Sequence, residues 1–222
     1  MSVLDKLRPQ VDATVEALSS ATFRVDPIAG ALFSRLVSVL SSAYKRHGSI
    51  IESAIVESLR SNPRYEVWRV EKFGIQQQAQ TTVAAALGDT SSLDHSHLPY
   101  VGDNAGDSSI QLDAVVFDHD TGIVSAYEIK RGNGYFDAGK QRSMKKDALL
   151  AKILLRSHCE TRGFEAVNSK THIIFYYGLR SVPAPIGLIG DELDDHFQMA
   201  IREDVELVNG YFRSRLFEII ST

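Results

Sequence analysis

The chain has 222 residues, of which 44% are hydrophobic and 23% charged, so it can bury one substantial core. It lacks a run of about 18 apolar residues and a secretory signal pattern, and its single cysteine excludes an internal disulfide or a cysteine-based zinc site. A formal net charge of −4 argues against a surface that attracts nucleic acid everywhere. We therefore expect one cytoplasmic domain over residues 1–222, with no membrane partner.

The first quarter of the chain is predicted to be helical, because its apolar residues recur at intervals of three and four. One helix is expected from Val3 to about Ser20 and a second from near Pro27 to Tyr44. A third is expected after Gly48, from Ser49 to Leu59, where the Asn62-Pro63 breaker follows.

Glu52 falls inside the apolar stripe of the third helix, whereas Glu57 lies on the opposite face. The later apolar residues of that stripe lie three, four and seven positions further on: Ile55, Val56 and Leu59. A carboxylate directed toward a core is costly unless it is paired or bound to a metal. Glu52 is therefore a candidate metal ligand, the alternative being an ordinary glutamate at the helix surface.

The middle of the chain contains runs that are typical of strands. Tyr65–Phe73 is expected to be a strand, and a long polar connection over 76–109 follows, with a short helix at 82–87. Two further strands, Ile110–Asp118 and Ile123–Lys130, are separated by the four-residue loop His119-Asp120-Thr121-Gly122, which predicts a hairpin.

After the hairpin we expect a helix over Lys140–His158, an interior strand over Thr171–Tyr177 and a closing helix over Glu203–Ile219 that Gly210 interrupts. This order predicts an α/β fold, a mixed central β-sheet flanked by helices with an N-terminal helical extension. We divide the single domain into an N-terminal helical part (1–47), a core (48–177) and a C-terminal helical part (178–222).

The hairpin loop fixes which side chains oppose one another. If Asp118 pairs with Ile123, counting back along the hairpin sets Asp113 opposite Glu128. Strand alternation adds Lys130 to the face of Glu128. Opposed carboxylates repel each other unless a cation compensates them, and hard oxygen ligands suit Mg²⁺ or Mn²⁺ better than zinc. The sequence therefore predicts two carboxylates and an ammonium around a divalent ion.

Asp113 followed, after fourteen residues, by Glu128-Ile129-Lys130 resembles the D-x(n)-(D/E)-x-K signature of the PD-(D/E)xK nucleases, the restriction-endonuclease-like superfamily. The setting is similar too, since the family has the aspartate and the ExK on neighbouring core strands, a helix after them and commonly a glutamate on the preceding helix. The sequence departs from the family name in having Gln111-Leu112, without proline, before Asp113.

The resemblance covers roughly 48–177 and implies a role for each matching residue. Asp113 and Glu128 are the implied metal ligands, Glu52 the auxiliary ligand, and Lys130 the residue that orients or deprotonates the attacking water. The alternative for Asp113, Glu128 and Lys130 is an exposed cross-strand ion pair, which is common and contributes little to stability.

Basic residues gather directly after this motif. The window from Lys130 to Lys146 contains six basic residues and one acidic residue, Asp137. It therefore carries a net charge of +5, which leaves −9 on the rest of the chain. The window is either a solvated helix face or the surface that holds phosphates beside the site. The candidate DNA contacts are Arg131, Lys140, Gln141, Arg142 and Lys145.

Other features point to no separate chemistry. His95 and His97, with Asp94, are more typical of an unliganded loop than of a metal site. Gly132-Asn133-Gly134 is expected to form a turn, and Cys159, at the end of an apolar helical run, is expected to be a buried, inert thiol.

The residues and the resemblance together predict a Mg²⁺-dependent endodeoxyribonuclease acting on double-stranded DNA, with Mn²⁺ able to substitute. The favoured form is a homodimeric type II restriction endonuclease of a restriction-modification system, because two-fold symmetry matches a palindrome. The N-terminal helices and the 76–109 segment are then available for dimerisation and DNA reading. The alternatives are a structure-specific or DNA-repair nuclease and a non-cleaving DNA-binding protein on the same fold.

Overall fold

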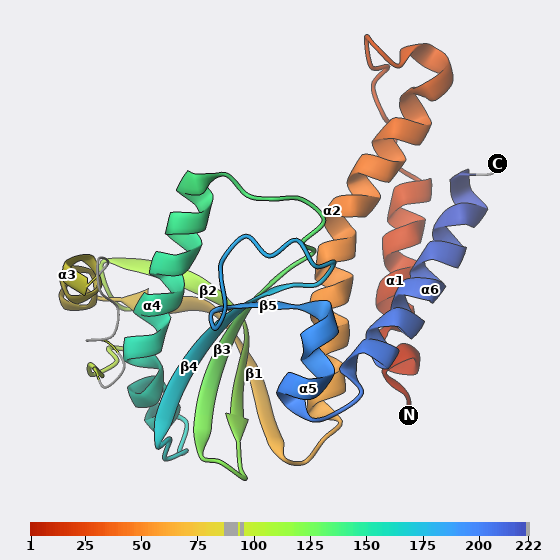
Figure 1. The fold of residues 1–222 in the computed structure, drawn as a ribbon. Helices are drawn as coiled ribbons and strands as arrows, with labels where there is room; N and C mark the ends of the chain where they lie inside the picture. The colour runs from red at the N-terminus through yellow and green to blue at the C-terminus, as the bar shows by residue number, and fades with distance from the viewer. Residues whose placement is uncertain (87–92, 94–95, 221–222) are drawn as a thin grey trace. The chain divides into compact units, whose positions relative to one another are not determined.

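The computed structural model describes residues 1–86, 93 and 96–220. The chain is α/β and forms two compact units, Met1–Ser61 with Asp194–Thr222, and Asn62–Leu193. The five-stranded mixed sheet belongs to the second unit (Figure 1). The borders at Ser61 and Leu193 lie further along the chain than those we expected at 47 and 177, so the segment 48–61 belongs to the helical unit.

The helical unit consists mainly of α1 (Val3–Ser19), α2 (Gly30–Arg60) and α6 (Ile201–Ile220), and the short α5 (Leu193–Phe197) lies at its border. A capping box starts α1, since the Ser2 hydroxyl accepts from the Asp5 N–H and the Asp5 carboxylate accepts from the Ser2 N–H. Each long helix buries one apolar stripe against the other two, which is what stabilises three helices of this amphipathic kind.

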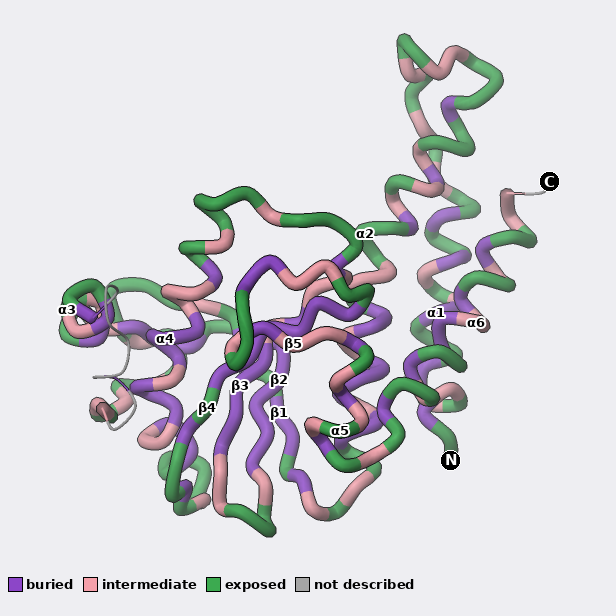
Figure 2. Tube along the Cα trace, in the orientation of Figure 1, coloured by how far each residue is buried: buried purple, intermediate pink, exposed green. Residues whose placement is uncertain are grey.

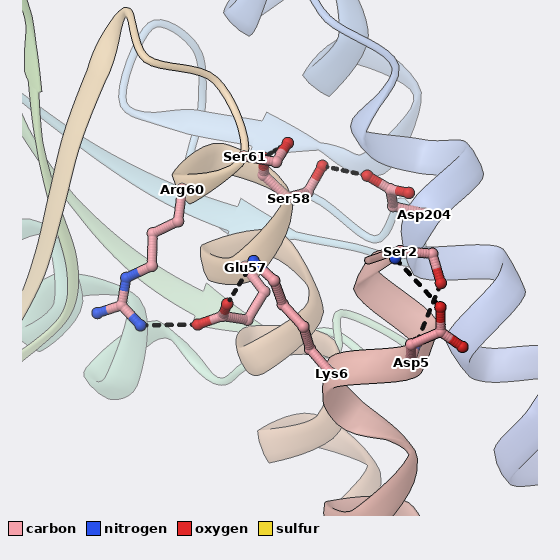
Figure 3. A network of polar contacts seen from close by, with 8 residues as sticks. All are labelled: Ser2, Asp5, Lys6, Glu57, Ser58, Arg60, Ser61 and Asp204. Atoms are coloured by element: carbon pink, nitrogen blue, oxygen red, sulfur yellow. Dashed lines mark hydrogen bonds and ion pairs between the residues drawn. The ribbon is translucent and has the colours of Figure 1, made fainter.

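Polar contacts join the same three helices at one end (Figure 3). Glu57 of α2 pairs with Lys6 of α1 at 3.4 Å and with Arg60, one turn along α2, at 2.7 Å. The Ser58 hydroxyl donates to the Asp204 carboxylate of α6 at 2.6 Å. These pairs account for Glu57, which the stripe analysis assigned to the polar face of its helix.

The expectation of two helices separated at Gly48 was wrong, because α2 runs unbroken for 31 residues. Glycine costs about 1 kcal/mol in a helix interior relative to alanine. The continuous buried stripe on either side of Gly48 outweighs that cost. The expected interruption of α6 at Gly210 was wrong for the same reason.

The sheet has the order β1-β2-β3-β4-β5. Its strands are β1 (Tyr65–Ile75), β2 (Ser108–Asp118), β3 (Ile123–Lys130), β4 (Asn168–Phe175) and β5 (Gly187–Ile189). The pairs β1/β2 and β2/β3 are antiparallel, whereas β3/β4 and β4/β5 are parallel. The crossover between parallel β3 and β4 contains a helix, α4 (Ala138–Thr161), as is usual for such pairs.

The main core of the sheet unit lies where α4 and α3 (Gln77–Ala86) pack beside the strands. Figure 2 colours most of the length of the strands as buried. Ile153 and Leu154 of α4 and Phe73 of β1 belong to this core and have no exposed surface. Each such side chain contributes about 1.5–3 kcal/mol relative to an exposed one. This burial fixes α4 beside β3 and β4.

Candidate active site

Asp113 lies at the point where β2 and β3 part. The expected hairpin register is confirmed over five pairs, from Asp118 with Ile123 to Ala114 with Tyr127. Asp113 is one position beyond the last of these pairs. There its Oδ2 accepts a hydrogen bond of 2.7 Å from the backbone N–H of Ile129, and its Oδ1 accepts one of 3.0 Å from the Gln111 side chain. The Asp113 side chain of β2 thus accepts from β3 a hydrogen bond of the kind that a backbone carbonyl would accept in a regular strand pair.

Glu128 and Lys130 form an ion pair on β3. The Lys130 Nζ lies 2.8 Å from Oε1 of Glu128, as expected for residues two apart on one face of a strand. Their side chains are 27% and 30% exposed, whereas Asp113 is 7% exposed. The ion pair is therefore open to solvent and the aspartate beside it is not.

The Asp113 carboxylate responds to both of these charges. Burial raises the pKa of Asp113 above 3.8, while the hydrogen bond from Ile129 and the charge of Lys130 oppose the shift and the charge of Glu128 adds to it. An additional cation near the carboxylates would stabilise their charged forms. The three residues that the motif singled out are thus close enough to influence one another.

Asp147 of α4 joins this group, and our sequence analysis missed it. Burial raises the pKa of Asp147, and the negative charge of Glu128 raises it further. Asp147 and Glu128 line one hollow between the helix and the sheet, together with Gln111 and His172. Spacing could have found it, since Asp147 lies three residues after buried Met144 and four before buried Ala151.

Any metal ion at this site would need ligands besides the protein's acidic side chains. Within the described ranges, no three His, Cys, Asp or Glu side chains are arranged so as to hold an ion by themselves. Magnesium takes one or two protein carboxylates and completes its shell with water and phosphate oxygens. Asp113 and Glu128 could supply those two carboxylates.

Glu52 lies on α2, in the helical unit, and is half-buried next to fully buried Ile51. The apolar residues of its predicted stripe, Ile55, Val56 and Leu59, are buried, whereas Glu52 itself is only half-buried. Its role as an auxiliary metal ligand stays a prediction.

The basic candidates follow the ion pair along the chain. Arg131 lies in the connection to α4, with its guanidinium 5.5 Å from the ring centre of Tyr177. Lys140 and Arg142 are exposed on the first turns of α4, and Lys145 is half-exposed. The side chain of Gln141 donates to the Phe136 carbonyl at 2.6 Å, so this residue has a structural role at the helix start.

The connection between β3 and α4 is pinned to the sheet at Gly132. Its φ is +68°, and a Cβ there would lie 2.7 Å from the carbonyl carbon of Phe175. The Leu179 N–H donates to the Gly132 carbonyl at 3.1 Å. Glycine is needed here for a close approach to β4, which agrees with the expectation of a turn.

The remaining sequence candidates do not join this site. Cys159 is fully buried, and burial raises its pKa to about 11, as expected for an inert thiol. His97 is exposed, whereas Asp94 and His95 lie outside the described residues.

Comparison of the chain with models of protein families, with curated proteins and with solved structures found no match. Of the helices in the described part of the chain, none combines the length and apolar character that crossing a bilayer requires.

Proposed function

We propose that this protein is a metal-dependent DNA endonuclease with a restriction-endonuclease-like core, which hydrolyses phosphodiester bonds at Asp113, Glu128 and Lys130. The observation that carries the proposal is the buried Asp113 carboxylate, held where β2 and β3 part and sensitive to the charges of the adjacent Glu128–Lys130 pair. A surface ion pair of the ordinary kind does not require a buried aspartate of raised pKa beside it.

Asp113 and Glu128 would hold Mg²⁺, with Mn²⁺ as a substitute, and Asp147 is available in the same unit as a further acidic group. When bound, the ion supplies Lewis acidity and neutralises charge on the phosphate. The repulsion among the carboxylates favours this occupancy, because a divalent cation relieves it.

Lys130 would act on the water and the phosphate. Its Nζ carries mobile donors and is partly open to solvent, so it can orient a water molecule in line with the scissile bond. The water oxygen then bonds to phosphorus and loses a proton to solvent, while the bond to the leaving sugar oxygen breaks and that oxygen takes up a proton from solvent. The Lys130 charge stabilises the negative charge that develops on the phosphoryl oxygens.

The proposed substrate is double-stranded DNA, held by the basic residues that follow the site. Lys140, Arg142 and Lys145 project from the first turns of α4, and Arg131 precedes them. Two copies of the chain would present two sites, one for each strand of a palindrome, as in a type II restriction endonuclease.

The test is incubation of the protein with plasmid DNA in Mg²⁺, in Mn²⁺ and in EDTA, followed by mapping of the cut ends. We expect cleavage that EDTA abolishes and that Asp113→Ala and Lys130→Ala each reduce at least about 100-fold, while DNA binding persists. The matched controls are Asp120→Ala, in the loop at the other end of the hairpin, and Lys72→Ala, on β1, which should cut normally.

The products also separate the biological roles. Discrete fragments would support a restriction endonuclease, whereas a smear or cleavage confined to branched DNA would favour a structure-specific or repair nuclease. A protein that cuts neither DNA nor RNA with either metal would overturn the proposal and leave a non-cleaving DNA-binding protein.

A further inference from the structure

The first half of α2 and the turn before it expose a group of apolar side chains. We call this group the apolar tip, and it consists of Val25, Ile28, Leu32, Phe33, Leu36 and Val37. Ile28 is 99% exposed, Leu32 82% and Phe33 54%. Contiguous exposed apolar surface of this kind marks an interaction site, whereas single exposed apolar residues do not.

The apolar tip continues the stripe by which α2 packs within its own unit. From Val39 onward that stripe is buried, with Val39 and Ala43 each 1% exposed. α2 has 31 residues, against 17 in α1 and 20 in α6, so it is roughly 20 Å longer than α1. The first turns of α2 extend beyond the ends of both neighbours and are largely exposed (Figures 1 and 2).

Hydrogen bonds give the apolar tip a defined shape. The Asp26 side chain accepts from the N–H groups of Ile28 and Ala29, each at 2.8 Å, and the Asp26 N–H donates to the Ser34 hydroxyl at 2.7 Å. The turn at 27–29 is thereby fixed against the start of α2. A preorganised surface loses less conformational entropy on binding than a flexible one.

The charge and the size of the apolar tip suit a second copy of the same chain. From Pro27 to Tyr44 the sequence has one charged residue, Arg35, whose guanidinium donates to the Ile219 carbonyl of α6, and Arg24 and Asp26 carry opposite charges on either side of Val25. Two copies would therefore meet with few charges between them. The exposed fractions of the tip correspond to on the order of 700 Å² per copy, close to the roughly 800 Å² that each partner buries in a standard interface.

We infer that the apolar tip is a homodimer interface, in which two copies of this chain pack their α2 helices together about a two-fold axis. In such an interface the same patch serves both copies, so a broad apolar helix face with few charges suits pairing with itself. The apolar tip would be the surface through which the dimer of the proposed function forms. The observations behind this inference all come from the helical unit and do not involve the proposed catalytic residues.

Sedimentation velocity of the full chain, without DNA or metal, tests the inference over a range of protein concentrations. We expect a dimer at about 10 µM, and we expect Leu32→Glu and Ile28→Glu each to raise the dimer Kd at least about 100-fold, because each buries an unpaired charge. The matched control is Leu207→Glu, at a 52% exposed position of α6, which should leave the Kd unchanged.

Circular dichroism separates loss of the interface from loss of the fold, since the residues replaced in the tip are more than 80% exposed and should leave thermal unfolding of the monomer intact. A wild-type chain that stays monomeric at 100 µM would overturn the inference, as would a dimer that both tip variants leave unchanged. No cleavage is measured, so a failure here is distinct from a failure of the proposed hydrolysis.

Discussion

The Asp113 carboxylate is well supplied with hydrogen bonds and is nevertheless costly to bury. Ile129 and Gln111 donate to its two oxygens, yet burial keeps its pKa above 3.8. A carboxylate with a raised pKa makes the folded state less stable once it is charged, because the unfolded chain ionises more easily. Such a cost is typical of a group that works with a bound ligand.

Replacing Asp113 with asparagine should therefore stabilise the protein while abolishing the proposed cleavage. The asparagine oxygen can accept from the Ile129 N–H, and its amide can donate to a reoriented Gln111. Because the folded-state pKa is raised, wild-type stability falls as the pH rises from 3.8 through that higher value, and the variant avoids this loss. At neutral pH in EDTA we expect a gain of about 1 kcal/mol, or a Tm about 2–4 °C higher.

Two comparisons make this prediction specific. Below pH 3.8 the wild type and Asp113→Asn should unfold at the same temperature, because the wild-type carboxyl is then neutral. Added Mg²⁺ should raise the Tm of the wild type and not that of the variant. A variant that is less stable at neutral pH would show that the hydrogen bonds outweigh the buried charge.

At the scale of elements, a salt bridge closes the corner at which β1 begins and β2 ends. The Arg64 guanidinium meets Asp118 through two hydrogen bonds, Nε to Oδ1 at 2.8 Å and Nη2 to Oδ2 at 2.6 Å. Arg64 also lies 3.3 Å from Asp120, whose side chain is 70% exposed. The hydrogen bond from Arg64 is the main reason that the pKa of Asp118 is lowered to about 2.

Asp118→Asn should destabilise the protein by about 1–2 kcal/mol at pH 7, because the variant loses the negative charge and one of the two oxygens that accept from Arg64. The folded-state pKa is depressed, so this stability is fully present above pH 3.8 and is lost as the pH falls toward 2. Urea titrations at pH 7 and pH 2 measure the difference. Asp120→Asn, in the same loop, should change stability by less than about 0.5 kcal/mol, and an equal loss in both variants would contradict the assignment.

The connection from β3 to α4 offers a second test among the elements. Gly132→Ala should cost about 1–3 kcal/mol or more, because the added Cβ would clash with the backbone of Phe175 at a positive φ. Gly134→Ala is the control, since a Cβ there has nothing within 4 Å. Thermal unfolding of the two variants decides the matter, and equal stabilities would mean that the loop can move away from β4.

Local patterns predicted the hairpin well and predicted less where tertiary contacts decide. A four-residue loop fixes the register from Asp118 to Ala114 without information from elsewhere in the chain. β5 has only three residues, too few for a periodic pattern, and we did not predict it. The expected strand over 171–177 is found at Asn168–Phe175, because parallel pairing with β3 sets its ends.

The candidate site likewise has parts that local patterns predict and parts that tertiary contacts determine. Glu128 and Lys130 are two apart on one strand, so their proximity follows from the sequence. Spacing predicts that Asp147 lies near the buried face of α4, but the effect of Glu128 on its pKa also requires that α4 packs beside β3, which the core determines.

At the scale of the whole molecule, the distribution of charge matters more than its sum. The chain carries −4, but the window from Lys130 to Lys146 carries +5 and leaves −9 elsewhere. Under the proposed function, DNA would approach the basic window more favourably than the rest of the chain, whose net charge is negative. Ionic strength changes both the attraction of DNA to the basic window and its repulsion by the rest of the chain, because salt screens both interactions.

DNA affinity should therefore fall steeply with salt, and the basic window should account for much of the slope. Combining Lys140→Ala, Arg142→Ala and Lys145→Ala should reduce the slope of log K against log salt by about 2–3, because each lost phosphate contact removes about 0.9. Removing the same charge at exposed Lys45, Lys72 and Arg213 should leave the slope unchanged. Fluorescence anisotropy with a DNA duplex in Ca²⁺, measured from 50 to 200 mM salt, compares the two variants. Equal slopes would place the DNA contacts outside α4, because two triple substitutions with the same change in net charge differ only in where that charge lies.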